Sequence, residues 1–289
     1  MKRRTFLLWT LPSLFFIIAV VGYPILYSIW ISFLDYDIHT LTGGFVGLKN
    51  YLDALSREEF KESLITTILY FGIPSLSIQI SLGFFIALLL NRKIKGRWVF
   101  LTLLLMPFMI PPVTAGLVMK WMFNPSWGIV NYFLSFFGLG GINWLGDPLF
   151  ARIAVILANV WQYSPLIALI FFAGLQSLPR APIEAAMMDG ASYWETVRYV
   201  IFPLMKPFIL FVLIIRSMDC LRIFDQVMIM TKGGPGFATE MFSIYNYRIG
   251  FRYFNLGEAA ALSLLYLLLL LGLIVGYVYF LYKKERGEL

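Results

Sequence analysis

Four ionisable residues interrupt an otherwise apolar stretch in the last third of the chain, and they are the first candidates for chemistry. Arg216, Asp219, Arg222 and Asp225 recur every three residues with alternating sign inside the segment 203–230. On a helix, side chains at this spacing can pair, and each step turns about 60° around the axis. We therefore expect the four side chains to spiral over half of a helix and not to face one pore.

Charges in an apolar segment have two explanations, and the sequence leaves both open. Buried charges usually pair, so the four could form a self-neutralising ladder that fixes the helix against its neighbours. Alternatively, some of them contact a polar substrate, because ionisable residues inside a membrane often mark the pathway of a substrate or ion. All four are therefore candidate substrate-path residues.

A second polar group lies in the apolar stretch 153–179, where Asn159, Gln162 and Tyr163 precede Pro165. Helical spacing places the three side chains on adjacent faces, and the proline can kink the helix. A neutral sugar needs such a combination, because amides bond to hydroxyl groups and an aromatic ring offers an apolar stacking surface. For Gln162 and Tyr163, packing between helices is the simpler explanation.

The connection 177–206 is too organised to be a flexible tether. Ile183–Asp189 is rich in helix-forming residues, and Gly190 suits the position that follows a helix end. Ser192 can cap a second helix, with Glu195 three residues later as its capping-box partner. The pattern predicts a helix–glycine–helix projection that carries two adaptable methionines. It either lies on a membrane surface or docks into a partner.

The composition indicates that membrane-spanning helices position all of these groups. Of the 289 residues, 60% are hydrophobic and 13% are charged, against roughly 45–50% and 25% in ordinary globular chains. A water-soluble fold of this size would lack the polar residues to cover itself. One cysteine and one histidine exclude a disulfide scaffold and a Cys/His metal site. The expected class is an all-α polytopic membrane protein, since open sheet edges do not sit in lipid.

Apolar stretches long enough to cross a bilayer predict six transmembrane helices in one transmembrane domain, residues 1–289. The aromatic-rich stretch 121–146 contains asparagines and glycines, so we expect an interfacial loop or a short surface helix there. Pro111 and Pro112 predict that the third span is either broken or kinked. The six predicted spans are residues 7–30, 64–90, 98–121, 153–176, 205–229 and 258–282.

The basic residues predict the orientation of the spans. Both chain ends and the second and fourth connections hold 13 of the 23 basic residues, whereas the other three connections hold six. Positive charge accumulates on the cytoplasmic side of membrane proteins. We therefore expect both termini in the cytoplasm.

The sequence contains none of the motifs that would indicate an enzyme. It has no GxxxxGK[ST] phosphate loop and no GxSG nucleophile motif. The chain is therefore not expected to hydrolyse a nucleotide itself or to carry a catalytic or metal site. Transporters, channels and assembly subunits are the remaining classes.

The loop sequence EAAMMDGASYWETVRYVIFPLMKP, residues 184–207, resembles the EAA loop of ABC importer permeases. FPL stands where LPL is commoner, and the matching residues are Glu184, Ala185, Ala186, Asp189, Gly190, Ala191, Ile201, Pro203, Leu204 and Pro207. RIFDQVMIMTKGGPGFATE, residues 222–240, resembles the end of the fifth span in the sugar-importing branch. Its matching residues are Phe224, Asp225, Thr231, Gly233, Gly234, Pro235 and Thr239. The resemblance covers the chain from about residue 60 onwards.

The resemblance implies a type I ABC importer permease fold of the maltose/trehalose, binding-protein-dependent type. In that family the loop couples the permease to the ATPase. The implied coupling residues are Glu184, Ala185, Ala186, Met187, Asp189, Gly190 and Ala191. Asn159 falls where permeases of this type place a sugar-contacting asparagine. The substrate would be a di- or oligosaccharide, and the arginines keep a charged sugar derivative, such as a uronic acid or phosphorylated polyol, as an alternative.

The resemblance also implies the partners. They are an ABC ATPase dimer that binds ATP and Mg²⁺, a second homologous permease, an extracytoplasmic sugar-binding protein and the lipid of a prokaryotic cytoplasmic membrane. No cofactor is expected in this chain, and no nucleic acid. Transport would proceed by alternating access driven by the partner ATPase. A secondary transporter driven by an ion gradient is the alternative.

Overall fold

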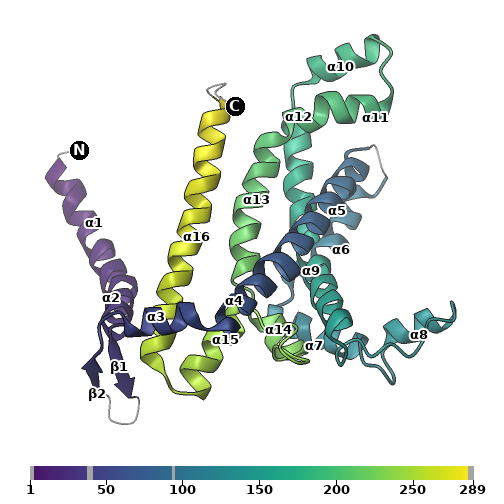
Figure 1. The fold of residues 1–289 in the computed structure, drawn as a ribbon. Helices are drawn as coiled ribbons and strands as arrows, with labels where there is room; N and C mark the ends of the chain where they lie inside the picture. The colour runs from purple at the N-terminus through teal and green to yellow at the C-terminus, as the bar shows by residue number, and fades with distance from the viewer. Residues whose placement is uncertain (1–2, 38–41, 93–94, 286–289) are drawn as a thin grey trace. The chain divides into compact units, whose positions relative to one another are not determined.

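The structure is a computed structural model that describes residues 3–37, 42–92 and 95–285. Over these residues the chain is almost entirely helical, with one short hairpin (Figure 1). It divides into two compact units, which are described separately. Unit 1 comprises Met1–Glu62 and Tyr245–Leu289, and unit 2 comprises Ser63–Ile244.

Unit 1 contains two long apolar helical segments, the hairpin and a short amphipathic helix. Its buried Asn50 joins these parts, because its amide donates to the backbone oxygens of Ser32 and Leu34, both at 2.9 Å. A second tie is the 2.7 Å ion pair between Arg57 and the buried Glu258. The elements are α1 (Arg3–Ile17), the π-helical turn η1 (Ile18–Gly22), α2 (Tyr23–Ile31), β1 (Leu34–Asp37), β2 (Thr42–Phe45), α3 (Lys49–Ser56), the π-helical turn η4 (Arg248–Arg252) and α16 (Leu256–Glu285). Helices α4 (Glu58–Ile65) and α15 (Phe242–Tyr247) begin in one unit and end in the other.

Unit 2 is built around the 30-residue helix α9 (Pro148–Ser177). Asp147 caps this helix, since its carboxylate accepts from the backbone N–H groups of Leu149 and Phe150. The other elements are the π-helical turns η2 (Thr66–Gly72) and η3 (Val197–Ile201), and the helices α5 (Ile73–Asn91), α6 (Arg97–Met109), α7 (Pro112–Met122), α8 (Ile129–Ser135), α10 (Arg180–Met188), α11 (Tyr193–Thr196), α12 (Phe202–Leu204), α13 (Lys206–Leu221) and α14 (Asp225–Met230).

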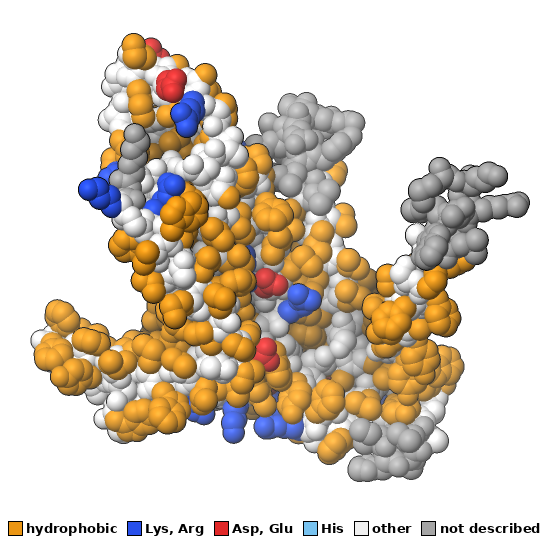
Figure 2. Space-filling view, turned by 180° about the vertical axis from the view of Figure 1, so that it is seen from behind, with side chains coloured by type: hydrophobic (Ala, Val, Ile, Leu, Met, Phe, Trp, Pro, Cys, Tyr) orange, Lys and Arg blue, Asp and Glu red, His pale blue; other side chains and the backbone are white. Residues whose placement is uncertain are grey.

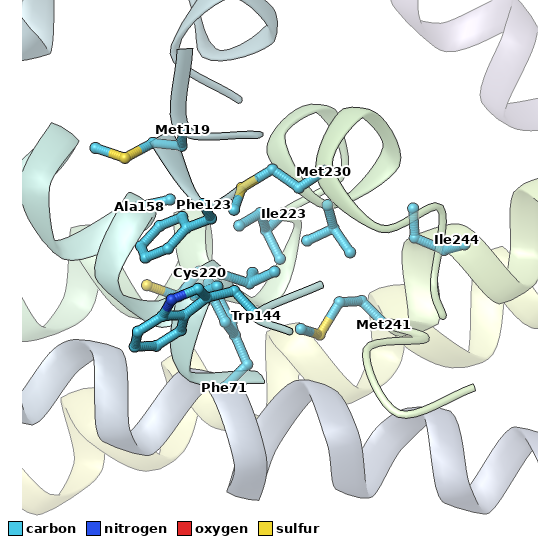
Figure 3. Packing of buried hydrophobic residues seen from close by; sticks show 13 residues of the cluster. Phe71, Met119, Phe123, Trp144, Ala158, Cys220, Ile223, Met230, Met241 and Ile244 are labelled. Atoms are coloured by element: carbon cyan, nitrogen blue, oxygen red, sulfur yellow. The ribbon is translucent and has the colours of Figure 1, made fainter. Parts of the chain in front are cut away.

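Close packing against α9 gives unit 2 its core. A Cβ atom on Gly83 of α5 would lie 2.6 Å from Ile167 Cγ2, so glycine allows the two helices to approach. A cluster of buried apolar side chains fills the space between α9, α7 and α14, with Phe123, Trp144 and Ile223 among its members (Figure 3). This packing fixes the positions of the helix backbones that carry the polar side chains of unit 2.

Six predicted spans agree with the helices of the structure when bent pairs are counted as single spans. Four uninterrupted segments are long and apolar enough to cross a membrane: Thr10–Ile31, Glu58–Asn91, Pro148–Ser177 and Leu256–Tyr277. Two bent pairs could each count as one further span, Arg97–Met109 with Pro112–Met122 at 95° and Tyr193–Leu204 with Lys206–Met230 at 63°. The predicted fifth span, 205–229, corresponds to the second member of the latter pair. The face in Figure 2 is mostly hydrophobic, as lipid contact requires.

Two expectations about irregular segments are confirmed. The third span is broken between α6 and α7 at Ile110–Pro111, because Pro111 and Pro112 cannot donate the backbone hydrogen bonds of a continuing helix. In the stretch 121–146, Trp121 and Met122 end α7, and the rest forms the short helix α8 with loops on either side. Its Trp127, Phe136 and Phe137 are exposed, which suits a position at a membrane interface.

Candidate functional site

A cavity of about 410 Å³ opens in unit 2 between α7, α9, α13 and α14. Six of the seven predicted substrate-path residues line it, and the seventh, Gln162, is buried beside it. The lining residues are Pro112, Asn159, Tyr163, Arg216, Asp219, Arg222, Ile223, Phe224, Asp225 and Gln226. Acidic and basic side chains lie next to each other within the apolar surface in Figure 2.

The expectation that the four charged residues spiral around one helix and cannot share a pore is wrong. Helix α13 ends at Leu221, and α14 begins at Asp225. Between them Phe224 leaves the helical conformation, with φ −136° and ψ −59°. The helix is interrupted there, and residues before and after the break, Arg216 and Asp225 included, line the same cavity.

Asp219 links two arginines of the cavity. Its Oδ2 lies 2.9 Å from Nη1 of Arg216, and its Oδ1 lies 3.6 Å from Nη2 of Arg222. Arg216 is 1% exposed, whereas the side chain of Arg222 is 62% exposed. The guanidinium of Arg216 also stacks 4.0 Å from the centre of the Tyr163 ring. Three of the four charges are therefore paired while they line the cavity.

A chain of four amide side chains connects Arg216 to the break in the third span. Arg216 Nε donates to Gln79 Oε1 at 3.3 Å, Gln79 Nε2 donates to Asn159 Oδ1 at 2.7 Å, and Asn159 Nδ2 donates to Gln226 Oε1 at 2.9 Å. Gln226 Nε2 then donates to Gln162 Oε1. Gln162 Nε2 donates to the backbone oxygen of Ile110 at 2.7 Å. All four amides are at most 2% exposed. Each of them both accepts and donates a hydrogen bond in this row, as buried polar groups require.

Two members of this chain, Gln79 and Gln226, are absent from the residues selected by sequence. The available signal was an amide in the middle of an apolar helix, which must find a partner when it is buried. Three of the four glutamines of the protein take part in this row of hydrogen-bonded amides. Their convergence depends on the packing of helices α5, α9 and α14, which no local pattern specifies.

The connection 177–206 forms the expected helix–glycine–helix projection. Figure 1 shows α10 and α11 beyond the ends of α9 and α13. Helix α10 begins at Arg180, two residues before Pro182, which the sequence suits to a helix start, and Gly190 follows its end with φ +84°. The N–H of Gly190 bonds to the oxygen of Met187 and the N–H of Ala191 to that of Ala186, which is a Schellman motif.

The surface of α10 is free of buried residues. Met187 is 56% exposed and Met188 is 87% exposed, so two flexible apolar side chains cover the tip of the projection. Glu184, Ala185, Asp189 and Gly190 are exposed with them. Such a surface can dock into an apolar cleft with a polar rim.

A capping box fixes the second helix of the projection. The Ser192 N–H donates to Glu195 Oε2 at 2.7 Å, and the Glu195 N–H donates to Ser192 Oγ at 3.4 Å. Hydrogen bonding of the Glu195 carboxylate to Ser192, first to its side chain and then to its backbone N–H, lowers the pKa of Glu195. The turn that joins α10 to α11 therefore has a defined geometry.

Comparison with known proteins identifies the family. Residues 79–285 match the family described as "Binding-protein-dependent transport system inner membrane component". The trehalose/maltose transport system permease protein MalF of Thermococcus litoralis is 38% identical over 94% of this chain and 91% of its own length. The sn-glycerol-3-phosphate transport system permease protein UgpA of Agrobacterium fabrum is 30% identical over 94% of this chain and 93% of its own length.

A solved structure shares the fold. A chain of a bacterial alginate ABC transporter in complex with an alginate pentasaccharide-bound periplasmic protein matches with a TM-score of 0.81. The match covers 95% of this chain and 93% of that chain at 22% identity. The chain is thus a multi-pass inner-membrane subunit that works with an ATPase and a periplasmic binding protein, and it is not itself a catalyst. This protein belongs to the binding-protein-dependent permease subunits of ABC importers.

Proposed function

We propose that this permease moves a neutral di- or oligosaccharide into the cell through the cavity lined by Asn159 and Tyr163. The observation that carries the proposal is the joint presence of a buried amide, an aromatic ring and paired charges around one cavity of about 410 Å³. Sites for small molecules measure roughly 300–1,000 Å³. Hydroxyl groups both donate and accept, so they match a lining of amides and ion pairs.

The pairing of charges favours a neutral sugar over an anion. The lining contains two arginines and two aspartates, and Asp219 already pairs with both arginines. An anionic substrate would have to displace this carboxylate. The similarity to a permease for sn-glycerol-3-phosphate supports the second candidate, a phosphorylated polyol or uronic acid bound by the exposed Arg222.

We further propose that the projection α10–α11 transmits ATP-driven closure to the membrane helices. The coupling residues would be Glu184, Ala185, Ala186, Met187, Asp189, Gly190 and Ala191. The exposure of five of them supports this role, whereas Ala186 and Ala191 are half-buried. The projection continues through η3 and α12 into α13, which carries Arg216 and Asp219. Movement of the projection therefore acts directly on the helix that lines the cavity, as alternating access requires.

The proposed assembly is a pair of homologous permeases, this chain and a second one, on an ATPase dimer. Units 1 and 2 would act together as one transmembrane domain, surrounded by lipid. Both termini would face the cytoplasm with the projection, in agreement with the distribution of basic residues. Lys2, Lys93 and Arg286 of that distribution lie outside the described residues.

Reconstitution into lipid vesicles tests the function. The complex of this chain with its partner subunits should take up labelled trehalose or maltose only under two conditions. ATP must be present on the side of the membrane where the ATPase lies, and sugar-loaded binding protein must be present on the opposite side. Uptake by the purified single chain, driven by an ion gradient without ATP, would indicate a secondary transporter. Uptake of glycerol phosphate but of neither disaccharide would favour the charged-substrate alternative.

A further inference from the structure

Gln79 lies behind the cavity and yet bonds to two residues that line it. It is fully buried in α5 at 0% exposure and is absent from the cavity lining. Its Oε1 accepts from Arg216 Nε at 3.3 Å, and its Nε2 donates to Asn159 Oδ1 at 2.7 Å. An amide is suited to this place because it offers one accepting and one donating group.

The two ends of the amide chain fix the direction of every bond in it. Arg216 can only donate, and the carbonyl oxygen of Ile110 can only accept. The four amides between them must therefore all donate in the same direction, from Arg216 toward Ile110. Turning one amide around would bring two donors or two acceptors together. Gln79, as the first amide, transfers the direction set by Arg216 to Asn159.

This direction decides what Asn159 presents to a ligand. Its Oδ1 accepts from Gln79, and one of its two N–H groups donates to Gln226. The second lone pair of Oδ1 accepts from the Cys220 thiol, so the remaining N–H is the group that Asn159 offers to a substrate hydroxyl. We propose that Gln79 is a positioning residue of the substrate site, which fixes the orientations of Asn159 and Arg216 without touching the substrate. This inference rests on the proposed sugar-import function.

Cys220 provides a native reporter of this arrangement. It is the single cysteine of the chain and is 1% exposed. Its Sγ lies 3.8 Å from Arg216 Nη2 and 3.9 Å from Asn159 Oδ1. The two groups that Gln79 holds therefore cover the thiol. If they are released, the thiol becomes accessible, whether or not a sugar is present.

The first test measures uptake of trehalose and maltose by the assembled transporter carrying Gln79→Glu or Gln79→Leu. Glutamate keeps the acceptor for Arg216 and loses the donor to Asn159, whereas leucine loses both. The expected result is a KM raised roughly fivefold, the equivalent of one hydrogen bond, with kcat per assembled complex nearly unchanged. Gln176→Glu is the matched control, because Gln176 pairs with Asn91 on the exposed surface.

A double-mutant comparison shows whether Gln79 acts through Asn159. In an Asn159→Ala background, Gln79→Glu should not raise the KM further, since the group that it positions is gone. An independent rise of the KM with each substitution, so that the increase in the double variant equals the product of the two single increases, would overturn the inference. So would a KM within twofold of the wild type for both Gln79 variants, even with less complex recovered, because a purely structural role predicts that result.

The second test needs no sugar and separates this inference from the proposed function. The assembled transporter is treated with a small methanethiosulfonate reagent, and modification of Cys220 is followed by mass spectrometry. Both Gln79 variants should react on the order of tenfold faster than the wild type and the Gln176→Glu control, because local opening is easier. An unchanged rate would overturn the role of Gln79. If the wild type imports neither disaccharide, the proposed substrate class is wrong, and the rate of Cys220 modification alone decides the inference.

Discussion

Arg216 and Asp219 form an ion pair of 2.9 Å in which the arginine is buried and the aspartate faces the cavity. The pair therefore connects the interior of unit 2 to the place where a substrate would bind. Two explanations were open for the charges in the fifth span: mutual pairing that fixes the helix, and contact with a substrate. Both apply to the same residues. Asp219 neutralises Arg216 and also lines the cavity.

Removing the carboxylate should destabilise the permease. Asp219→Ala leaves the guanidinium of Arg216 without its anionic partner in a buried position, and we expect a loss of about 2 kcal/mol in the free energy of unfolding. Asp219→Asn keeps an accepting oxygen and should lose less. The measurement is thermal unfolding of the purified complex, with Asp225→Ala as a control from the same cavity. Equal midpoints for wild type and Asp219→Ala would contradict the pairing role.

The long elements of this fold could be predicted from sequence because their causes are local. A span needs only a sufficient apolar length, and Gly190, Ser192 and Glu195 mark the ends of the helices of the projection within a few residues. The break after Leu221 could not be predicted in this way. Residues 222–224 contain neither glycine nor proline, so tertiary packing ends the helix there.

The cavity could be predicted only in part for the same reason. Asn159 and the charged residues stood out because polar groups are rare in these spans. The bond between Gln79 and Arg216 joins residues 137 positions apart, and no periodicity reports such a contact. Sequence reasoning therefore found Asn159, Gln162 and the charged residues and missed Gln79 and Gln226, the two amides that connect them.

Truncating Asn159 should impair transport more than assembly. Asn159→Ala removes the amide that lines the cavity and leaves Gln79 and Gln226 each without one partner. We expect uptake at low substrate concentration to fall roughly tenfold or more, because a bond to the substrate and its supporting network are lost together. Ser164→Ala on the same helix is the matched control, since the Ser164 hydroxyl is buried and has no hydrogen-bond partner among the described residues. Unchanged uptake kinetics would show that Asn159 does not contact the substrate.

A side chain at Gly190 should weaken coupling to the ATPase. The residue has φ +84°, and a Cβ there would meet no atom of the described residues within 4 Å, so we attribute the effect of Gly190→Ala to backbone strain. The strain amounts to about 1 kcal/mol and should shift the turn between α10 and α11. Co-purification of the ATPase and ATP-driven uptake should both decrease. Gly190→Asn should be milder because asparagine tolerates this conformation.

The control for Gly190 is a glycine with the same geometry in another connection. Gly96 has φ +74°, and the residues that the structure describes leave equally open space around its Cβ position. Gly96→Ala introduces the same kind of strain outside the projection, so the ATPase should remain bound. If both substitutions release the ATPase equally, the effect is general destabilisation and Gly190 has no particular role in coupling.

Acidification should loosen the projection through Glu195. Its pKa is lowered in the folded protein by the hydrogen bonds from Ser192, so the stabilisation is present above the ordinary pKa of a glutamate, about 4.3, and is lost as the pH falls through the lower folded value. Retention of the ATPase by the wild type, measured from about pH 6 to about pH 3, should therefore decrease below about pH 4.3. Glu195→Gln keeps the accepting oxygen for the Ser192 N–H and cannot titrate. The amount of ATPase that this variant retains should therefore fall less with acidification than the amount that the wild type retains. Identical curves for the two proteins would show that the capping box does not control docking.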